Sequence, residues 1–263
     1  MTSNSDILRR AELAITEFEN SKISGVWTGL DQQQIIAELR SRLVNPFNIN
    51  QGTQPFCGPA AIIFELIRKN PLAYIQLCRN LFQIGGFHTQ TNRWISPPQW
   101  LQESPLNFQI PQVDWMVLST LRESENIIFS VDPNAPQLLR NLAGITKTWE
   151  MAGWIQEILG YQTVNYRNAY LFGDLEAIET ANQMIQSGGV AFALINDSGL
   201  LLNQPPVFPY PNHWVVLLDK IQINLNSNLI HFKVYTWGKE MQITVNLKTF
   251  KTYFWEVVIG IES

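Results

Sequence analysis

The hydrophobic pattern of the chain changes near residue 189, and this change constrains the fold more than any other feature of the sequence. Before it, apolar residues recur at the three- and four-residue spacing of amphipathic helices. After it, runs rich in β-branched and aromatic residues alternate with turn signals. Helices followed by a mainly antiparallel sheet predict an α+β fold.

Local signals mark the ends of the predicted helices. Asp31 is a favourable N-cap, the Asn70-Pro71 step separates two helices, and Gly85-Gly86 ends the second of them. The proline-rich residues 87–111 are interpreted as a loop. Helices are predicted at residues 5–20, 31–44, 57–69, 71–84, 112–124, 135–143 and 147–159, and from residue 174 to the glycines at 188–189.

The strands are predicted mainly in the last third of the chain, at residues 162–166, 190–196, 213–223, 229–237, 241–247 and 253–261. We therefore expect a single domain over residues 1–263. It would consist of an N-terminal helical extension (1–45), a mainly helical lobe (46–188) and a sheet lobe (189–263).

Charge and composition argue against several classes of partner. The net charge of −4 and the lack of a basic run disfavour nucleic acid. The apolar stretches are too short to cross a membrane, and the N-terminal residues lack the apolar core of a signal peptide. A cytoplasmic protein is expected, although export by a signal-independent route would leave no mark. The sequence does not fix the oligomeric state.

Metal and cofactor sites are not predicted, because the two cysteines and three scattered histidines have no ligand spacing. Cys57 carries the most specific chemical signal instead. It opens a predicted helix and is followed by Gly58-Pro59. A helix N-terminus lowers the pKa of a thiol and so favours the nucleophilic thiolate. The alternative is a small apolar residue that begins a core helix, as predicted for Cys78 within its helix.

A cysteine nucleophile needs an imidazole base and a donor for the oxyanion. His213 is the best candidate for the base, because it lies where a proline-rich loop becomes a strand. His231 lies inside a strand and His88 follows a helix stop, so neither is favoured. The side-chain amide of Gln51 or of Gln54 could donate to the oxyanion.

Three motifs in this order resemble the papain-like cysteine peptidase superfamily: Q-x5-C-G-P-A-A from residue 51, H-W-V-V from residue 213 and Y-T-W-G from residue 235. The CGPAA form is especially similar to the bacteriocin-leader-processing branch. The resemblance covers the residues around Cys57 and those from position 212 onward. It implies a papain-like fold in which Gln51 is the oxyanion-hole amide, Cys57 the nucleophile and His213 the general base and acid.

The residue that orients the imidazole departs from the superfamily's Asn or Asp. Aligning the Y-T-W-G motif on the papain-type motif places Tyr235 at that position, whereas strand alternation favours Thr236, and Glu240 is a third candidate. Neither Tyr235 nor Thr236 carries a charge, so either would stabilise the imidazolium less than an anion does.

The expected function is a cysteine-dependent hydrolase of peptide or amide bonds that acts on a peptide or protein substrate through an acyl-enzyme. The apolar, proline-rich residues 199–212 are a candidate substrate-binding lip. Alternatives on the same fold are an acyltransferase or transglutaminase, a deamidase-type effector or toxin, and an inactive papain-like binding protein. The segments at 132–134 and 196–199 are interpreted as turns only.

Overall fold

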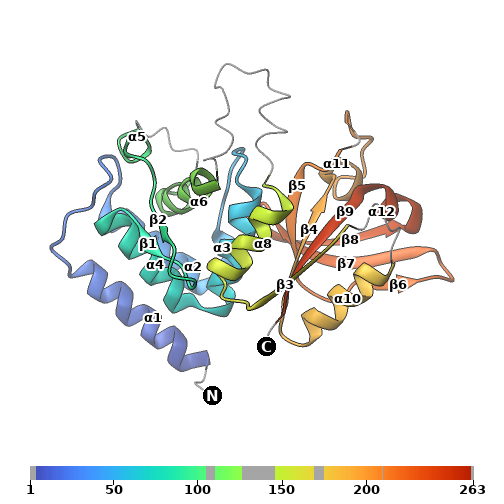
Figure 1. Ribbon diagram of the computed structural model, residues 1–263, viewed down its shortest axis with the longest axis horizontal. Helices are drawn as coiled ribbons and strands as arrows, with labels where there is room; N and C mark the ends of the chain where they lie inside the picture. The colour runs from blue at the N-terminus through green and yellow to red at the C-terminus, as the bar shows by residue number, and fades with distance from the viewer. Residues whose placement is uncertain (1–3, 105–109, 126–145, 169–174, 209, 262–263) are drawn as a thin grey trace. The chain divides into compact units, whose positions relative to one another are not determined.

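The computed structural model describes residues 4–104, 110–125, 146–168, 175–208 and 210–261. The predicted α+β class with an antiparallel sheet is confirmed. The chain forms two compact units, residues 1–130 and 131–263. Figure 1 draws the helices of the first unit in blue to green and the sheet of the second in yellow to red.

The first unit is mainly helical. Its central helix is α3, which is buried from Cys57 to Ile67 and packs against α4 and α6. The elements are α1 (Asn4–Glu19), α2 (Gln32–Val44), η1 (Pro46–Asn48), α3 (Cys57–Lys69), α4 (Pro71–Ile84), β1 (Phe87–His88), β2 (Trp94–Ile95), α5 (Gln99–Gln102) and α6 (Gln112–Glu125).

The predicted bounds of α3 and α4 are confirmed, and the capping residues Asn70 and Gly85 explain where α3 ends and where α4 begins and ends. Asn70 accepts a hydrogen bond from the Ala73 N–H at 3.1 Å, and Pro71 occupies the first position of α4. Gly85 ends α4 in the left-handed region at φ 76°. The predicted N-cap Asp31 likewise accepts from the Gln34 N–H at 2.8 Å.

The second unit is a seven-stranded antiparallel sheet in the order β3-β9-β4-β5-β7-β6, with β8 paired to β7. Helix α10 packs on β4 and β9, α12 packs on β7, β8 and β9, and α8 packs on β3 and β9. The elements are α8 (Thr148–Glu157), β3 (Thr163–Asn168), α10 (Leu175–Gln186), β4 (Val190–Ile195), α11 (Asp197–Leu200), β5 (His213–Leu217), β6 (Gln222–Asn224), β7 (Leu229–Thr236), β8 (Lys239–Asn246), α12 (Leu247–Tyr253) and β9 (Phe254–Ile261).

Several predicted elements differ from the structure. The segment 87–111 is not only a loop, because it contains the short β1–β2 hairpin and α5. The single strand expected at 213–223 is divided into β5 and β6, and the helix α12 was not predicted. Helices α8 and α10 and strand β3, from the segment 147–188, pack within the second unit. The helix and turn predicted at 135–143 and 132–134 lie outside the described residues.

Within the described part of the chain, no helix combines the length and apolar character that a membrane span requires.

Candidate functional site

Cys57 is the first residue of α3, with Phe56 at the N-cap and Pro59 in the first turn. Its side chain is 7% exposed. Helix α3 can begin here because proline needs no hydrogen-bond partner in the first turn. Cys78 lies in α4 with a fully buried thiol, and burial raises the pKa of that thiol far above its ordinary value. Of the two cysteines, Cys57 is the one that lies at the N-terminus of a helix.

The loop that leads into α3 is folded by its own hydrogen bonds. Gln54 N–H donates to Gln51 O at 3.2 Å, and Phe56 N–H donates to Gln54 O at 2.8 Å. The Gln51 side chain is buried and donates through Nε2 to Gln54 O at 3.4 Å. An amide nitrogen carries two hydrogens, so this contact uses only one of the donors of Gln51.

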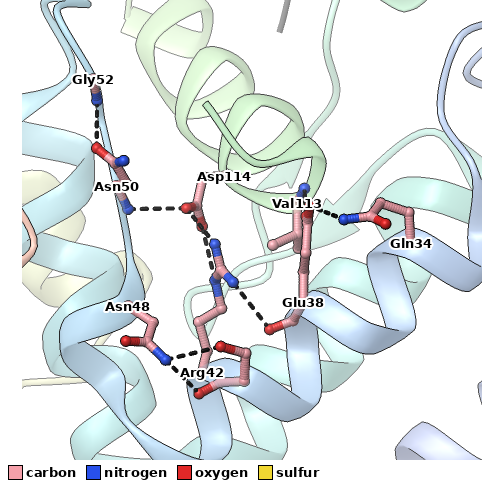
Figure 2. A network of polar contacts seen from close by, with 9 residues as sticks. Gln34, Glu38, Arg42, Asn48, Asn50, Gly52, Val113 and Asp114 are labelled. Carbon is pink, nitrogen blue, oxygen red and sulfur yellow. Dashed lines mark hydrogen bonds and ion pairs between the residues drawn. The ribbon is translucent and has the colours of Figure 1, made fainter. Parts of the chain in front are cut away.

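A buried ion pair fixes the start of this loop to α6. Arg42 donates to Asp114 through Nη2 at 2.6 Å and through Nε at 3.3 Å, and Asp114 also accepts from the Asn50 N–H at 2.9 Å (Figure 2). The Asn50 side chain in turn accepts from the Gly52 N–H at 2.8 Å. The backbone on both sides of Gln51 is thus connected to one buried carboxylate.

The pKa of the buried Asp114 carboxylate depends on its partner Arg42. Burial raises the pKa of Asp114 to about 6, against the opposing effects of the Arg42 guanidinium and the Asn50 N–H. Glu38 completes the network by accepting from the Val113 N–H at 2.8 Å (Figure 2). At the other end of the loop, the Phe56 ring contacts Trp115 with centroids 6.0 Å apart. Two consecutive residues of α6 therefore hold the two ends of the loop.

A polar pocket adjoins this network but does not include Cys57. Its own groups satisfy one another: Asp31 N–H donates to the Gln112 side chain at 2.7 Å, and Gln34 donates to Glu38 at 2.8 Å. The pocket is lined by Asp31, Gln34, Glu38, Ile110, Pro111 and Gln112.

In the second unit, His213 begins β5 and is 5% exposed. Its Nε2 lies 2.6 Å from the hydroxyl of Thr236, the last residue of β7. The contact expected between these two side chains is present. Because this contact uses Nε2, Nδ1 is the ring nitrogen that has no hydrogen bond within the described residues. Burial lowers the pKa of His213 to about 4, and the carboxylate of Asp197 opposes this shift.

The imidazole of His213 is also stacked on an indole. The ring centroids of His213 and Trp237 are 4.9 Å apart and the rings are inclined by 26°. Trp237 and Gly238 form the two-residue turn between β7 and β8, and both have positive φ, 47° and 72°. Two residues of positive φ suit the twist of a tight hairpin, although tryptophan is strained there. The strained turn holds the indole against the imidazole.

The other candidates for the orienting residue lie differently. Tyr235 is buried and is paired with Val216 of β5. Glu240 is largely exposed and forms an ion pair with Lys233 at 3.7 Å. Among the three histidines, His231 is hydrogen-bonded to Thr244 at an exposed position. The His88 ring contacts Trp94, with ring centroids 4.9 Å apart and the rings inclined by 60°.

Three residues near His213 were not singled out from the sequence, because the 196–199 segment resembles an ordinary turn. Asn196 is buried, accepts from the Gly199 N–H at 3.0 Å and caps α11. Asp197 N–H donates to the Asn212 side chain at 2.9 Å, and Asn212 returns a bond to the Asp197 carboxylate at 2.6 Å. Asn212 directly precedes His213, so the end of β4 and the start of β5 are connected by side chains.

The predicted lip is anchored by the same segment. The Asn196 amide donates to the carbonyl oxygens of Phe208 at 3.0 Å and Tyr210 at 2.7 Å. The side chains of Val207, Phe208 and Tyr210 are exposed. An apolar surface therefore lies a few residues before His213.

The structure thus brings Gln51 and Cys57 together in one loop and helix, and His213 and Thr236 together in one sheet. The first pair belongs to the first unit and the second pair to the second. Among the described residues, no group of three or more His, Cys, Asp or Glu side chains could hold a metal ion. In comparisons with known proteins, the sequence matches no family model and no curated protein.

Proposed function

We propose that this chain is a papain-like cysteine hydrolase of peptide or amide bonds, with Cys57 as the nucleophile and His213 as the general base and acid. The observation that carries the proposal is the oriented imidazole: His213 is buried, its Nε2 is 2.6 Å from the Thr236 hydroxyl, and its ring is stacked on Trp237. An imidazole with one nitrogen fixed and the other available is what a general base requires.

In the proposed mechanism, the neutral ring of His213 carries its hydrogen on Nε2, and this N–H donates a hydrogen bond to the Thr236 hydroxyl. Nδ1 then accepts the proton of the Cys57 thiol, and the thiolate attacks the carbonyl carbon of the substrate. The Gln51 amide and the backbone N–H of Cys57 donate to the oxyanion. The imidazolium protonates the leaving amine, and a water molecule deprotonated by His213 releases the acyl group.

The buried ion pair of the first unit supports this assignment, because a catalytic donor must be held in place before the reaction. Arg42 and Asp114 fix the backbone on both sides of Gln51, and Trp115 contacts the residue before Cys57. The exposed apolar residues Val207 and Phe208 favour a substrate with apolar groups near the bond that is cleaved.

The experiment that tests the proposal is the pH dependence of iodoacetamide alkylation of Cys57. An ordinary thiol of pKa about 8.5 reacts roughly 75-fold more slowly at pH 6 than at pH 8. We expect less than about a tenfold difference in the wild type, because transfer of the thiol proton to Nδ1 of His213 would form a thiolate–imidazolium pair that persists between these pH values. The ratio of the two rates cancels the slow access that burial of Cys57 imposes.

The control is a matched pair of histidine variants. His213→Gln should restore the large ratio of an ordinary thiol, whereas His231→Gln, at an exposed site beside Thr244, should leave the ratio unchanged. If the wild type already shows the ratio of an ordinary thiol, or if His213→Gln has no effect on it, Cys57 and His213 do not act together and the proposal fails.

A further inference from the structure

Two hydrogen bonds made by the Asn212 side chain hold Asp197 next to the residue that precedes the histidine strand. Asn212 donates to the Asp197 carboxylate at 2.6 Å, and the Asp197 N–H donates to the Asn212 side chain at 2.9 Å. The Asn212 N–H also donates to Ile195 O at 2.9 Å, and Ile195 is the β4 partner of His213. Asp197 is therefore fixed two residues beyond the position that pairs with the imidazole.

The carboxylate of Asp197 is held in one orientation. Its Oδ1 accepts from the Ser198 N–H at 2.6 Å and from the Ser198 hydroxyl at 3.2 Å, in addition to the bond from Asn212. Such a carboxylate cannot rotate away from its neighbours without losing several donors at once. It is a fixed negative charge rather than a mobile surface side chain.

Among the described residues, the side chains that bond to or stack on His213 are neutral. Thr236 offers a hydroxyl and Trp237 an indole, and neither can balance the charge of an imidazolium. The remaining charged groups on the neighbouring strands have other partners or lie at exposed positions. They are Lys233 and Glu240, which pair with each other, Lys239 at the exposed start of β8, and Glu256 of β9, which accepts from Thr148.

We propose that Asp197 is an electrostatic positioning residue for His213. Thr236 fixes the orientation of the ring, and Asp197, held by Asn212, supplies the negative charge that favours the protonated form. Two separate residues would thus share the task that a single carboxylate performs in a catalytic triad. The catalytic consequence rests on the proposed function, whereas the charge effect on His213 does not.

The charge effect can be measured directly by NMR titration of the ring of His213, assigned with His213→Gln. Asp197→Asn keeps an acceptor oxygen for Asn212 and Ser198 but removes the charge. We expect the pKa of His213 to fall by about one unit in this variant, the order expected for one nearby charge at an effective dielectric constant of about 20. Asp197→Glu, which restores the charge, should recover most of the shift.

The matched control is Asp219→Asn, which removes a carboxylate from the same unit, one that accepts from the Lys220 N–H. It should leave the pKa of His213 unchanged. Urea unfolding at pH 8, where the ring is neutral, reports whether Asp197→Asn also disturbs the fold. Equal pKa values of His213 in Asp197→Asn and Asp219→Asn overturn the proposal.

The titration is repeated in a Cys57→Ala background so that the two proposals can fail separately. A shift that persists without the thiol supports the role of Asp197 even if Cys57 shows the alkylation profile of an ordinary thiol. If the pKa of His213 in Asp197→Asn equals the wild-type value while Cys57 is activated, the hydrolase proposal stands and Asp197 has no part in it.

Discussion

Replacing Asn196 with alanine tests how the loop before His213 is held. The side chain is 1% exposed and makes three hydrogen bonds, from Nδ2 to the carbonyl oxygens of Phe208 and Tyr210 and to Oδ1 from the Gly199 N–H. Each such bond contributes about 0.5–1.5 kcal/mol to stability. Because the two loop residues are exposed, water can replace the bonds to their carbonyl oxygens, which lowers the cost. We expect Asn196→Ala to reduce the free energy of unfolding by about 2–3 kcal/mol.

The matched control is Asn182→Ala in the same unit. Asn182 is also buried and makes two hydrogen bonds, both to the backbone of Ile221, at 2.6 and 2.8 Å. Its loss should reduce the free energy of unfolding by about 1–3 kcal/mol. Ile221 lies between β5 and β6, so this variant should not affect the loop before His213.

Two measurements separate the variants. Urea unfolding at pH 7.5 gives the loss of stability, and hydrogen exchange with mass spectrometry follows the backbone amides from Gly199 to Phe208. Faster exchange is expected in Asn196→Ala only, and the activity attributed to His213 should fall with it. The reasoning is refuted if Asn196→Ala costs less than about 0.5 kcal/mol, or if Asn182→Ala accelerates exchange in the same amides.

Two further predictions concern the buried ionisable groups. Burial lowers the pKa of His213 from 6.5 to about 4. Between these two pH values the unfolded chain binds a proton at this residue and the folded chain does not, so the free energy of unfolding decreases as the pH falls. Between pH 7.5 and pH 5 the free energy of unfolding should fall by about 2 kcal/mol more in the wild type than in His213→Gln, as measured by urea unfolding at both pH values. Equal decreases in the two proteins would contradict the burial argument. Arg42→Met leaves the Asp114 carboxylate buried without its cation, which should cost about 3–5 kcal/mol at pH 8, and the double variant with Asp114→Asn should be the more stable of the two. A double variant less stable than Arg42→Met would show that the charges are not what the network depends on.

The extent to which the fold follows from the sequence depends on how local the signals are. Helices α3 and α4 were predicted with their observed ends, because Asn70, Pro71 and Gly85 act on the backbone within a few residues of themselves. The pairing of Thr236 with His213 also followed from a local rule, the alternation of side chains along a strand. These features need no knowledge of the rest of the chain.

The features that sequence reasoning missed depend on distant pairings. Arg42 and Asp114 are 72 residues apart, and no spacing rule connects a helix residue to a partner on a later helix. The short helix α12 was missed because its residues resemble the neighbouring strands, and it forms only where the chain turns between β8 and β9. The predicted strand at 213–223 was too long because its apolar pattern continues across the turn that separates β5 from β6.

The missed role of Asp197 shows the same limit within the candidate site itself. In sequence the residue belongs to a turn, and its relation to the imidazole arises only because Ile195 and His213 are paired across β4 and β5. The strand register brings Asn212 next to the segment that begins at Asn196, where the Asn212 side chain donates to the Asp197 carboxylate and accepts from the Asp197 N–H. A carboxylate that is connected to His213 through the preceding residue, Asn212, cannot be recognised by a motif that places an anion on the next strand.

This arrangement has a consequence for the base itself. A carboxylate in direct contact would keep the imidazole partly protonated near neutral pH, whereas burial beside a hydroxyl and an indole lowers the pKa of His213 to about 4. The ring then takes up no proton from solvent over most of the physiological range and is able to accept the proton of a thiol. The fixed charge of Asp197 limits the cost of the imidazolium once that proton arrives, so the two effects favour a base that is protonated only by the thiol it is proposed to activate.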